Sequence, residues 1–316
     1  MQIKKNISLK NKNWFKTGGH SKFYCEPKNM IDFQEAIKFA KVNKLEIFAL
    51  GHGANVLIND DGFDGLTIKP QLKNITIKYI SKNAHFLPIL VTAHTSVKIQ
   101  DLIDFCLKNN LIGLEEFSAI PGTVGGSTYI NIHYFNSSLS DFIHSATIIN
   151  KDSGKIFNVD KNWFNFGYDK SKLQKKENFL ISTTFKLKKV NDFQTYYAKG
   201  RRYEIIRHRQ HRYPNSNTCG SFFKNFLPQE IDFEINNKKI TSIAYYLDKL
   251  GIKGKLKIGN AIISPKHANM IETLPGATTT DIIKLAKQMQ KLVKKEFGII
   301  PKPECQVIGF KKNPFL

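Results

Sequence analysis

Apolar and polar residues alternate along much of this chain with the two-residue period of short strands, and a few segments show helical spacing instead. The first helical segment follows Asn29, a residue type that favours the N-cap, and its apolar positions recur every three or four residues up to Ala40. Strands are predicted on both sides of it, which makes a β-α-β unit. In the first third, the predicted strands are 22–26, 46–50, 66–69, 74–80 and 86–93, and the predicted helices are 30–40 and 97–109, the latter with Ile99, Leu102, Ile103 and Cys106 facing inward.

The second half of the chain continues the mixture of strands and helices. Its predicted strands are 146–150, 155–159, 179–187, 260–263 and 304–310, and its predicted helices are 192–209, 240–250 and 281–297. Lys-Asp-Ser-Gly joins the first two strands as a hairpin turn, and Thr278 or Thr279 caps the last helix. A lone terminal strand cannot satisfy its own backbone, so 304–310 is expected to pair with an earlier segment. The pattern predicts an α+β protein.

Composition limits the class of protein. The chain has 316 residues, 41% of them hydrophobic, and no apolar run reaches the roughly 18 residues that a membrane span needs. Its N-terminus has basic residues without a hydrophobic stretch behind them, so a cytoplasmic protein is expected. Cys25, Cys106, Cys219 and Cys305 are widely separated and read as reduced, buried thiols, and the nine histidines form no metal signature.

The net charge of +22 raises the question of a polyanionic partner. The basic residues are spread along the chain, and the densest run, 199–212, has no nucleic-acid motif around it. Non-specific binding to nucleic acid at low salt is expected, but no specific nucleic-acid site and no membrane partner. A monomer or weak oligomer acting on a small molecule is the favoured interpretation.

Two glycine-rich segments are the strongest chemical signal in the chain. In SAIPGTVGG, residues 118–126, three glycines beside a proline and a threonine leave backbone N–H groups accessible to an anion. LGHGANVLI, residues 50–58, places a second glycine turn between two apolar runs. Two such cradles suit a diphosphate, whereas one cluster alone would favour a tight turn that binds nothing. The candidate cofactor contacts are Gly51, His52, Gly53, Ala54, Asn55, Pro121, Gly122, Thr123, Gly125 and Gly126.

Six motifs in order give the chain a family resemblance. The chain resembles the UDP-N-acetylenolpyruvoylglucosamine reductases, because its motifs follow the order found in that family: LGHGANVL, SAIPGTVGG, FGY, GSFFKN, SPKHAN and PKPECQVIGF. The similarity runs from about residue 13 to residue 310. The resemblance implies a cytoplasmic flavoenzyme that uses NADPH and FAD to reduce the enolpyruvyl ether of UDP-N-acetylglucosamine to UDP-N-acetylmuramate for peptidoglycan. No histidine or cysteine stands in an attachment motif, so the FAD is expected to be non-covalent. The short link before GSFFKN resembles the shorter, second type of the family.

The resemblance also implies a domain organisation and site residues. The fold would be a two-subdomain flavin-binding region of the vanillyl-alcohol-oxidase type, formed by 1–72 with strand 304–316 and by 73–200, plus a smaller α/β substrate domain, 201–303. Ser221 would protonate the substrate carbon, and Glu304 would stabilise the enol intermediate. The implied contacts to the UDP-sugar are Lys224, Asn225, Lys266, His267 and Asn269.

The largest departure from the family pattern is in FGYDKS, residues 166–171. Asp169 stands where the family has an arginine that holds the substrate carboxylate, and Lys170 follows it. A one-residue shift such as a bulge would aim Lys170 into the site and turn Asp169 outward. Smaller departures are Ala54, Phe226 and the run Ile132-His133-Tyr134.

Three functions therefore remain open at the level of the sequence. The favoured one is the NADPH- and FAD-dependent reductase. The second is an FAD-dependent oxidoreductase of the same fold with a different substrate, which Asp169 motivates. The third is a non-catalytic flavin-binding or polyanion-binding protein that uses the +22 charge.

Overall fold

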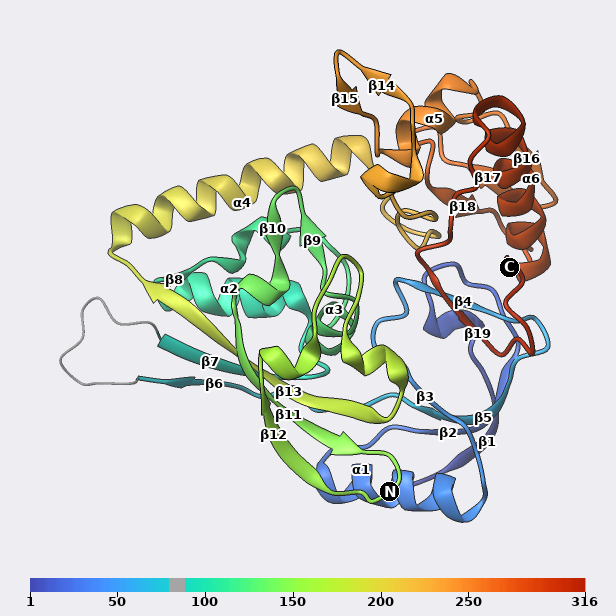
Figure 1. The fold of residues 1–316 in the computed structure, drawn as a ribbon. Helices are drawn as coiled ribbons and strands as arrows, with labels where there is room; N and C mark the ends of the chain where they lie inside the picture. Colours follow the sequence, from blue (N-terminus) through green and yellow to red (C-terminus); the bar gives the residue numbers. More distant parts are fainter. Residues whose placement is uncertain (80–88, 316) are drawn as a thin grey trace. The chain divides into compact units, whose positions relative to one another are not determined.

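The longest strand, β13 (Asn178–Lys189), is central to the largest sheet of the computed structural model (Figure 1). The structure describes residues 1–79 and 89–315. The sheet order is β12-β11-β13-β7-β6, all antiparallel, and β8 pairs with the far end of β13. The other strands of this sheet are β6 (Ile75–Lys78), β7 (Ile89–His94), β8 (Leu111–Ile112), β11 (Ile143–Asn150) and β12 (Ile156–Asp160). The predicted hairpin is confirmed as β11–β12, while residues 80 and 86–88 of two predicted strands lie outside the described residues.

The chain divides into two compact units. The first unit contains residues 1–4, 23–52 and 65–209, and the second contains residues 5–22, 53–64 and 210–316. The division crosses strands β1 (Lys4–Ser8), β2 (His20–Cys25) and β5 (Phe63–Ile68). The three-part organisation inferred from the resemblance, with its boundaries near 72, 200 and 303, remains a proposal.

The β-α-β unit near the N-terminus is present. It consists of β2, α1 (Met30–Val42) and β3 (Ile47–Ala49), and β3 pairs with β5 in parallel. Asn29 caps α1 as predicted, because its side chain accepts a hydrogen bond of 2.9 Å from Asp32 N. The sheet order is β1-β2-β5-β3. Strand β1 was not predicted, since Lys4 and Lys5 make the N-terminal segment look like a polar arm.

Helices of the first unit cover apolar faces. Helix α2 (Ile99–Lys108) buries Ile99, Leu102, Ile103 and Cys106, as its spacing predicts. These side chains pack with Val91, Phe117 and Phe185 in one core cluster. Further elements of this unit include α3 (Val124–Ile130), β9 (His133–Tyr134), β10 (Ser137–Ser138) and the 3₁₀ helix η2 (Leu114–Phe117), and helix α4 (Asp192–Arg212) begins in it.

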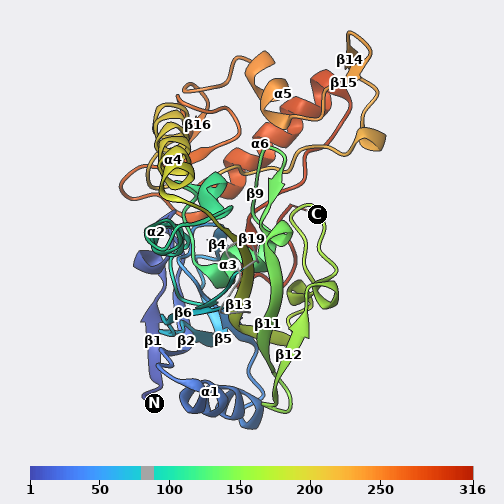
Figure 2. The same ribbon diagram turned by 90° about the vertical axis from the view of Figure 1, so that its left-hand side faces the viewer.

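The second unit is organised around helix α6 (Thr279–Phe297), which α5 (Ile243–Lys249) contacts (Figure 2). Thr278 is the N-cap of α6 and forms a reciprocal capping box with Asp281. The C-terminal strand β19 (Gln306–Ile308) pairs in parallel with β4 (Val56–Ile58), so the predicted return of the last strand to an early segment is confirmed. The remaining strands are β14 (Glu234–Ile235), β15 (Lys238–Lys239), β16 (Lys257–Ile258), β17 (Ala261–Ile263) and β18 (Ile271–Thr273).

Two further expectations concern the whole chain. All four cysteines are buried and none forms a disulfide. Within residues 1–79 and 89–315, no helix combines the length and the apolar character that crossing a membrane requires.

Candidate functional site

Close packing shapes the glycine-rich segment 118–126, which we call the glycine turn of the first unit. A Cβ on Gly125 would lie 2.0 Å from Thr95 Oγ1, and a Cβ on Gly51 would lie 2.8 Å from Thr123 Oγ1. Both distances are too short for any side chain, so each glycine permits an approach that no other residue allows. The second contact also brings the two glycine segments together, which the sequence did not establish.

Only part of the predicted amide cradle is available to a ligand. Gly125 N donates to Thr95 O (2.9 Å), and Gly126 N donates to the Thr123 side chain (3.3 Å), so these two amides cannot serve an anion as expected. The reason is that Thr123 caps α3, a short helix that the sequence pattern did not reveal. Among the described residues, the amides of Gly51, Gly122 and Thr123 donate to no protein acceptor.

A buried hydroxyl adds to this donor set, because Ser127 Oγ is buried and has no hydrogen-bond partner among the described residues. In the second unit, Asn55 Oδ1, which can only accept a hydrogen bond, is also buried without a partner among those residues. Ser127 Oγ lies 3.5 Å from where a Gly122 Cβ would be. Unbonded amides and hydroxyls in a glycine-lined turn are the groups that a diphosphate requires, so the residues present fit the diphosphate of FAD.

Two other predicted cofactor contacts, Gly53 and His52, have different surroundings in the structure. Gly53 has φ +69°, and a Cβ there would meet Lys12 O at 2.4 Å, so this glycine is required by packing inside the second unit. His52 keeps part of its surface open to solvent, but neighbouring atoms partly desolvate its imidazole. This desolvation, and then the charges of Lys98 and Lys69, lower the pKa of His52 below its usual range, so the ring is neutral at pH 7.

The segment containing Ser221 lies between two other extended segments of the second unit. Phe222 N donates to Asn269 O (2.7 Å), and Phe222 O accepts from Glu304 N (2.8 Å). The backbone pairing continues with Lys224 N, which donates to Lys302 O at 2.9 Å. Ser221 and Glu304, 83 positions apart by subtraction of their numbers, are therefore brought onto adjoining segments.

Ser221 itself is only partly buried and follows Gly220, whose φ of +83° favours glycine. Its hydroxyl makes no hydrogen bond to another described residue. Burial, and next the contact with Cys305, raise the pKa of the neighbouring Cys219 thiol well above its usual value. That thiol therefore stays protonated and does not act as a base beside Ser221.

Asn269 does not have the environment of a substrate contact. Its Nδ2 donates to Phe223 O (2.8 Å) and its Oδ1 accepts from Phe223 N (3.0 Å), so the amide completes the backbone pairing of the Ser221 segment. The residue is 2% exposed. Both polar atoms of the side chain are thus engaged by the backbone of Phe223, and the contact of Asn269 with the UDP-sugar stays a prediction.

The other predicted substrate residues are more accessible. Asn225 is exposed, and its Oδ1 accepts from Ile243 N (3.2 Å) at the start of α5. Lys266 Nζ donates to Gln210 O (3.0 Å). His267 Nδ1 accepts from Asn269 N (3.2 Å), and burial lowers the pKa of this imidazole to about 4. The ring is thus neutral at pH 7 and bears its proton on Nε2.

The expected orientation at FGYDKS is reversed. Gly167 and Lys170 exchange backbone hydrogen bonds of 3.0 and 3.2 Å and close a tight turn, and Asp169 has φ +50°. In this turn Lys170 is exposed, whereas Asp169 is 4% exposed and its carboxylate lies 3.4 Å from His133 Nδ1. This is an ion-pair distance without hydrogen-bond alignment. The predicted bulge is wrong because a turn, not an extended segment, contains Asp169.

Comparisons with known proteins agree with this architecture. The profile of "UDP-N-acetylenolpyruvoylglucosamine reductase, C-terminal domain" matches residues 211–308, and that of "FAD binding domain" matches residues 21–160. The UDP-N-acetylenolpyruvoylglucosamine reductase of Orientia tsutsugamushi (strain Boryong) is 32% identical over 311 residues, covering 98% of this chain and 95% of the relative. The enzyme of that name from Clostridium botulinum (strain 657 / Type Ba4) is 30% identical over 307 residues, covering 96% and 92%.

A solved structure shares the fold. The UDP-N-acetylenolpyruvylglucosamine reductase from Thermus caldophilus superimposes with a TM-score of 0.77 at 22% identity, covering 98% of this chain and 99% of that one. The likeness extends over both units.

Proposed function

The chain belongs to the UDP-N-acetylenolpyruvoylglucosamine reductase family, and from this membership we propose that it reduces UDP-N-acetyl-3-O-(1-carboxyvinyl)glucosamine to UDP-N-acetylmuramate in peptidoglycan precursor synthesis. NADPH is the proposed reductant, and non-covalent FAD is the proposed cofactor. The observation that carries the proposal is the pairing of the Ser221 segment with the Glu304 segment, because it joins a proton donor to a carboxylate in the matched C-terminal domain.

The proposed FAD contacts are on the glycine turns. The free amides of Gly51, Gly122 and Thr123 and the hydroxyl of Ser127 would hold the diphosphate. When bound, FAD supplies the chemistry of accepting hydride from NADPH and passing it on. Pro121 orders the turn, since its ring fixes φ before Gly122 reaches +145°.

Ser221 is the proposed proton donor. The enolpyruvyl group must gain a proton on the carbon next to the one that receives hydride. A serine hydroxyl is a weak acid, so it serves only when it is held beside the accepting carbon. The backbone pairing of the Ser221 segment supplies that rigidity, and no described residue bonds the hydroxyl. Glu304 is proposed to stabilise the enol form of the substrate from the adjoining segment.

The UDP moiety is proposed to contact those predicted substrate residues of the second unit that keep accessible polar atoms. These are Lys224, Asn225, Lys266 and His267. Neutral His267 would donate through Nε2 to an oxygen, and the lysines would offset the negative charge of the diphosphate. The buried Asn269 would act indirectly, by holding the Ser221 segment.

The buried Asp169 favours a second candidate, an FAD-dependent oxidoreductase of the same fold with a substrate other than the enolpyruvyl ether. A carboxylate repels the anionic group of that ether unless a cation stands nearby. Lys170 is the proposed cation in the first candidate, because it is exposed at the same turn. The two candidates therefore differ in what Lys170 does.

The experiment that separates them is anaerobic reduction of the purified, yellow protein by NADPH, followed by addition of the UDP-enolpyruvyl substrate. Rapid reoxidation of the flavin is expected. Lys170→Ala should lower kcat/KM about a hundredfold if the ammonium acts on developing charge. Lys172→Ala is the matched control, since Lys172 lies over the Trp163 ring at 4.7 Å.

The opposite outcome has a clear meaning. If Lys170→Ala changes nothing while Asp169→Arg raises kcat/KM strongly, the chain lacks a substitute cation and the second candidate is favoured. Acid precipitation tests the cofactor proposal separately, because a non-covalent flavin is released into the supernatant.

A further inference from the structure

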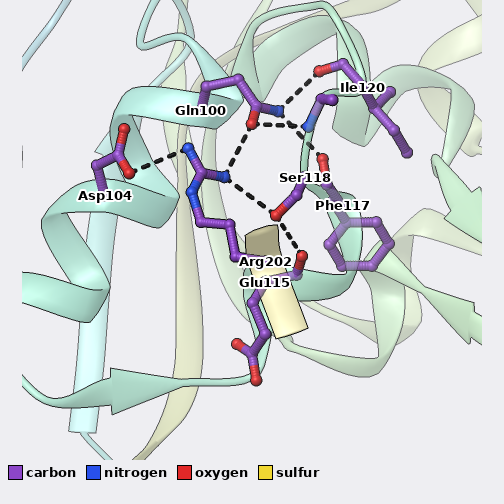
Figure 3. A network of polar contacts seen from close by, with 8 residues as sticks. Gln100, Asp104, Glu115, Phe117, Ser118, Ile120 and Arg202 are labelled. Atoms are coloured by element: carbon purple, nitrogen blue, oxygen red, sulfur yellow. Dashed lines mark hydrogen bonds and ion pairs between the residues drawn. The ribbon is translucent and has the colours of Figure 1, made fainter. Parts of the chain in front are cut away.

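Arg202 of helix α4 places a largely buried guanidinium against the segment that enters the glycine turn (Figure 3). Its side chain is 14% exposed. Nη1 donates to Gln100 Oε1 and to Ser118 Oγ, both at 3.0 Å, and Nη2 lies 3.0 Å from Asp104 Oδ1. The guanidinium thus joins α4, α2 and residue 118 at a single point.

The side chain of Gln100 takes the place of a strand partner for this segment. Its Nε2 donates to Phe117 O (3.1 Å) and Ile120 O (2.9 Å), and its Oε1 accepts from Ala119 N (2.9 Å). One carboxamide therefore bonds a total of three backbone groups within the four-residue run 117–120. Arg202 holds that carboxamide in its orientation by donating to the same Oε1.

The conformation held in this way is an unusual one. Ala119 has φ +58°, which costs an L-residue energy and persists only when surrounding contacts enforce it. Pro121 and Gly122 lie two and three positions further along the chain, and Gly122 O accepts from Ile99 N at 3.2 Å. Consecutive residues of α2, Ile99 and Gln100, therefore hold both sides of the turn whose amides are free.

We propose that Arg202 is a positioning residue for the cofactor. By fixing Gln100 and Ser118, it sets the direction in which the chain enters the turn, and so aims the amides of Gly122 and Thr123 at the diphosphate of FAD. This inference rests on FAD being the ligand, as in the proposed function, but it does not depend on the substrate. Arg202 contacts α2 and Ser118, so its effect on FAD is transmitted through the turn.

Arg201 supplies a matched control. It is the neighbouring residue of the same helix, is 47% exposed, and forms a two-pronged pair with Glu116 at 2.8 and 2.8 Å. Replacing either arginine by methionine removes one positive charge and one ion pair. Only Arg202→Met also releases Gln100, so a general loss of attraction between a basic protein and anionic FAD affects both variants equally.

The test measures the Kd of FAD by titrating the apoprotein with the flavin and following its fluorescence. Arg202→Met should raise Kd about tenfold or more, as expected when a charge-assisted hydrogen bond that orients the site is lost, whereas Arg201→Met should stay within about threefold. Gln100→Leu should raise the Kd of FAD as much as Arg202→Met does. The double variant should have a Kd no higher than that of the single variant that binds FAD more weakly, because both changes disturb the same contact. Arg202→Lys should be intermediate, because an ammonium cannot reach three acceptors in a plane.

Hydrogen–deuterium exchange of the apoprotein provides the second readout. The peptide covering residues 114–123 should exchange faster in Arg202→Met and Arg202→Lys than in Arg201→Met. The proposal is overturned if Arg202→Met lowers thermal stability without changing Kd, if Arg201→Met weakens FAD equally, or if the 114–123 peptide is unaffected. The lysine variant keeps the test open should the methionine variant not fold. A wild-type protein that binds FAD but does not reduce the UDP-enolpyruvyl substrate refutes the proposed function alone.

Discussion

The glycine turn of the first unit and the Ser221 segment of the second unit are held by different kinds of groups. The Gln100 side chain, which Arg202 orients, bonds three backbone groups of residues 117–120. The Ser221 segment instead pairs through its main chain with residues near 269 and near 302–304. A turn held by side chains adopts a shape that no regular element provides, but one substitution disturbs it. A segment held by its backbone leaves its own side chains available for chemistry.

Ser221→Ala is the variant that tests this comparison most sharply. It should leave the backbone of the Ser221 segment in place while removing the hydroxyl proposed to donate the proton. We expect substrate-dependent reoxidation of the flavin to slow by about 10²- to 10⁴-fold, the usual contribution of a positioned proton donor. Reduction by NADPH and thermal stability should be nearly unchanged. Stopped-flow absorbance separates the two half-reactions, with Ser216→Ala on the exposed part of the same stretch as control. Equal slowing of both halves would contradict the assignment.

Asn269→Ala removes a side chain that bonds the backbone of the Ser221 segment. It leaves the N–H and C=O of Phe223 buried and unpaired, and we expect it to cost about 2–4 kcal/mol of unfolding free energy. Asn225→Ala, which removes an acceptor at the exposed start of α5, should cost about 1 kcal/mol. Denaturant melts measure both. If the two variants were equally stable, the backbone pairing alone would hold the segment.

Acid should weaken the second unit through His267. Burial favours its neutral form, so the pKa falls from 6.5 in the unfolded chain to about 4 in the folded protein. The unfolded chain therefore binds the extra proton between these values, and stability should fall by roughly 2–3 kcal/mol as pH drops from 6.5 to 4, then level off. His267→Gln should flatten this slope in thermal melts taken across that range. An unchanged slope would mean that another group causes the acid sensitivity.

The smallest expected effect distinguishes two adjacent glycines of the first unit. Gly125→Ala should destabilise the protein by about 1–3 kcal/mol, because the new methyl group would overlap Thr95 Oγ1. Gly126→Ala should be neutral or slightly stabilising, since its nearest contact is 3.7 Å away and its position is helical. Thermal unfolding of the two variants measures the difference. Equal melting temperatures would show that the turn relaxes more easily than its packing indicates.

Predictions from the sequence succeeded where the signal lies within a few residues. The caps at Asn29 and Thr278 are each formed with a residue three positions away, and the Lys-Asp-Ser-Gly turn joins two adjacent strands. The prediction failed at Asp169, because the choice between a turn and an extended segment depended on the pairing of Gly167 with Lys170 and on burial against His133. Helix α3 was missed because glycines at 125 and 126 are poor helix formers, and tertiary packing overrides that propensity.

The sequence by itself determined that this is an α+β protein with two glycine turns, and that Ser221 and Glu304 belong to the motifs of one enzyme family. Periodicity, caps and turns are local properties, so they can be read residue by residue. Only the tertiary structure decided which amides remain free, that Asn269 completes the pairing of Phe223 46 positions away, and that Arg202 reaches Gln100 across 102 positions. Those outcomes depend on which distant segments meet, since a buried donor takes whichever acceptor the fold brings within reach.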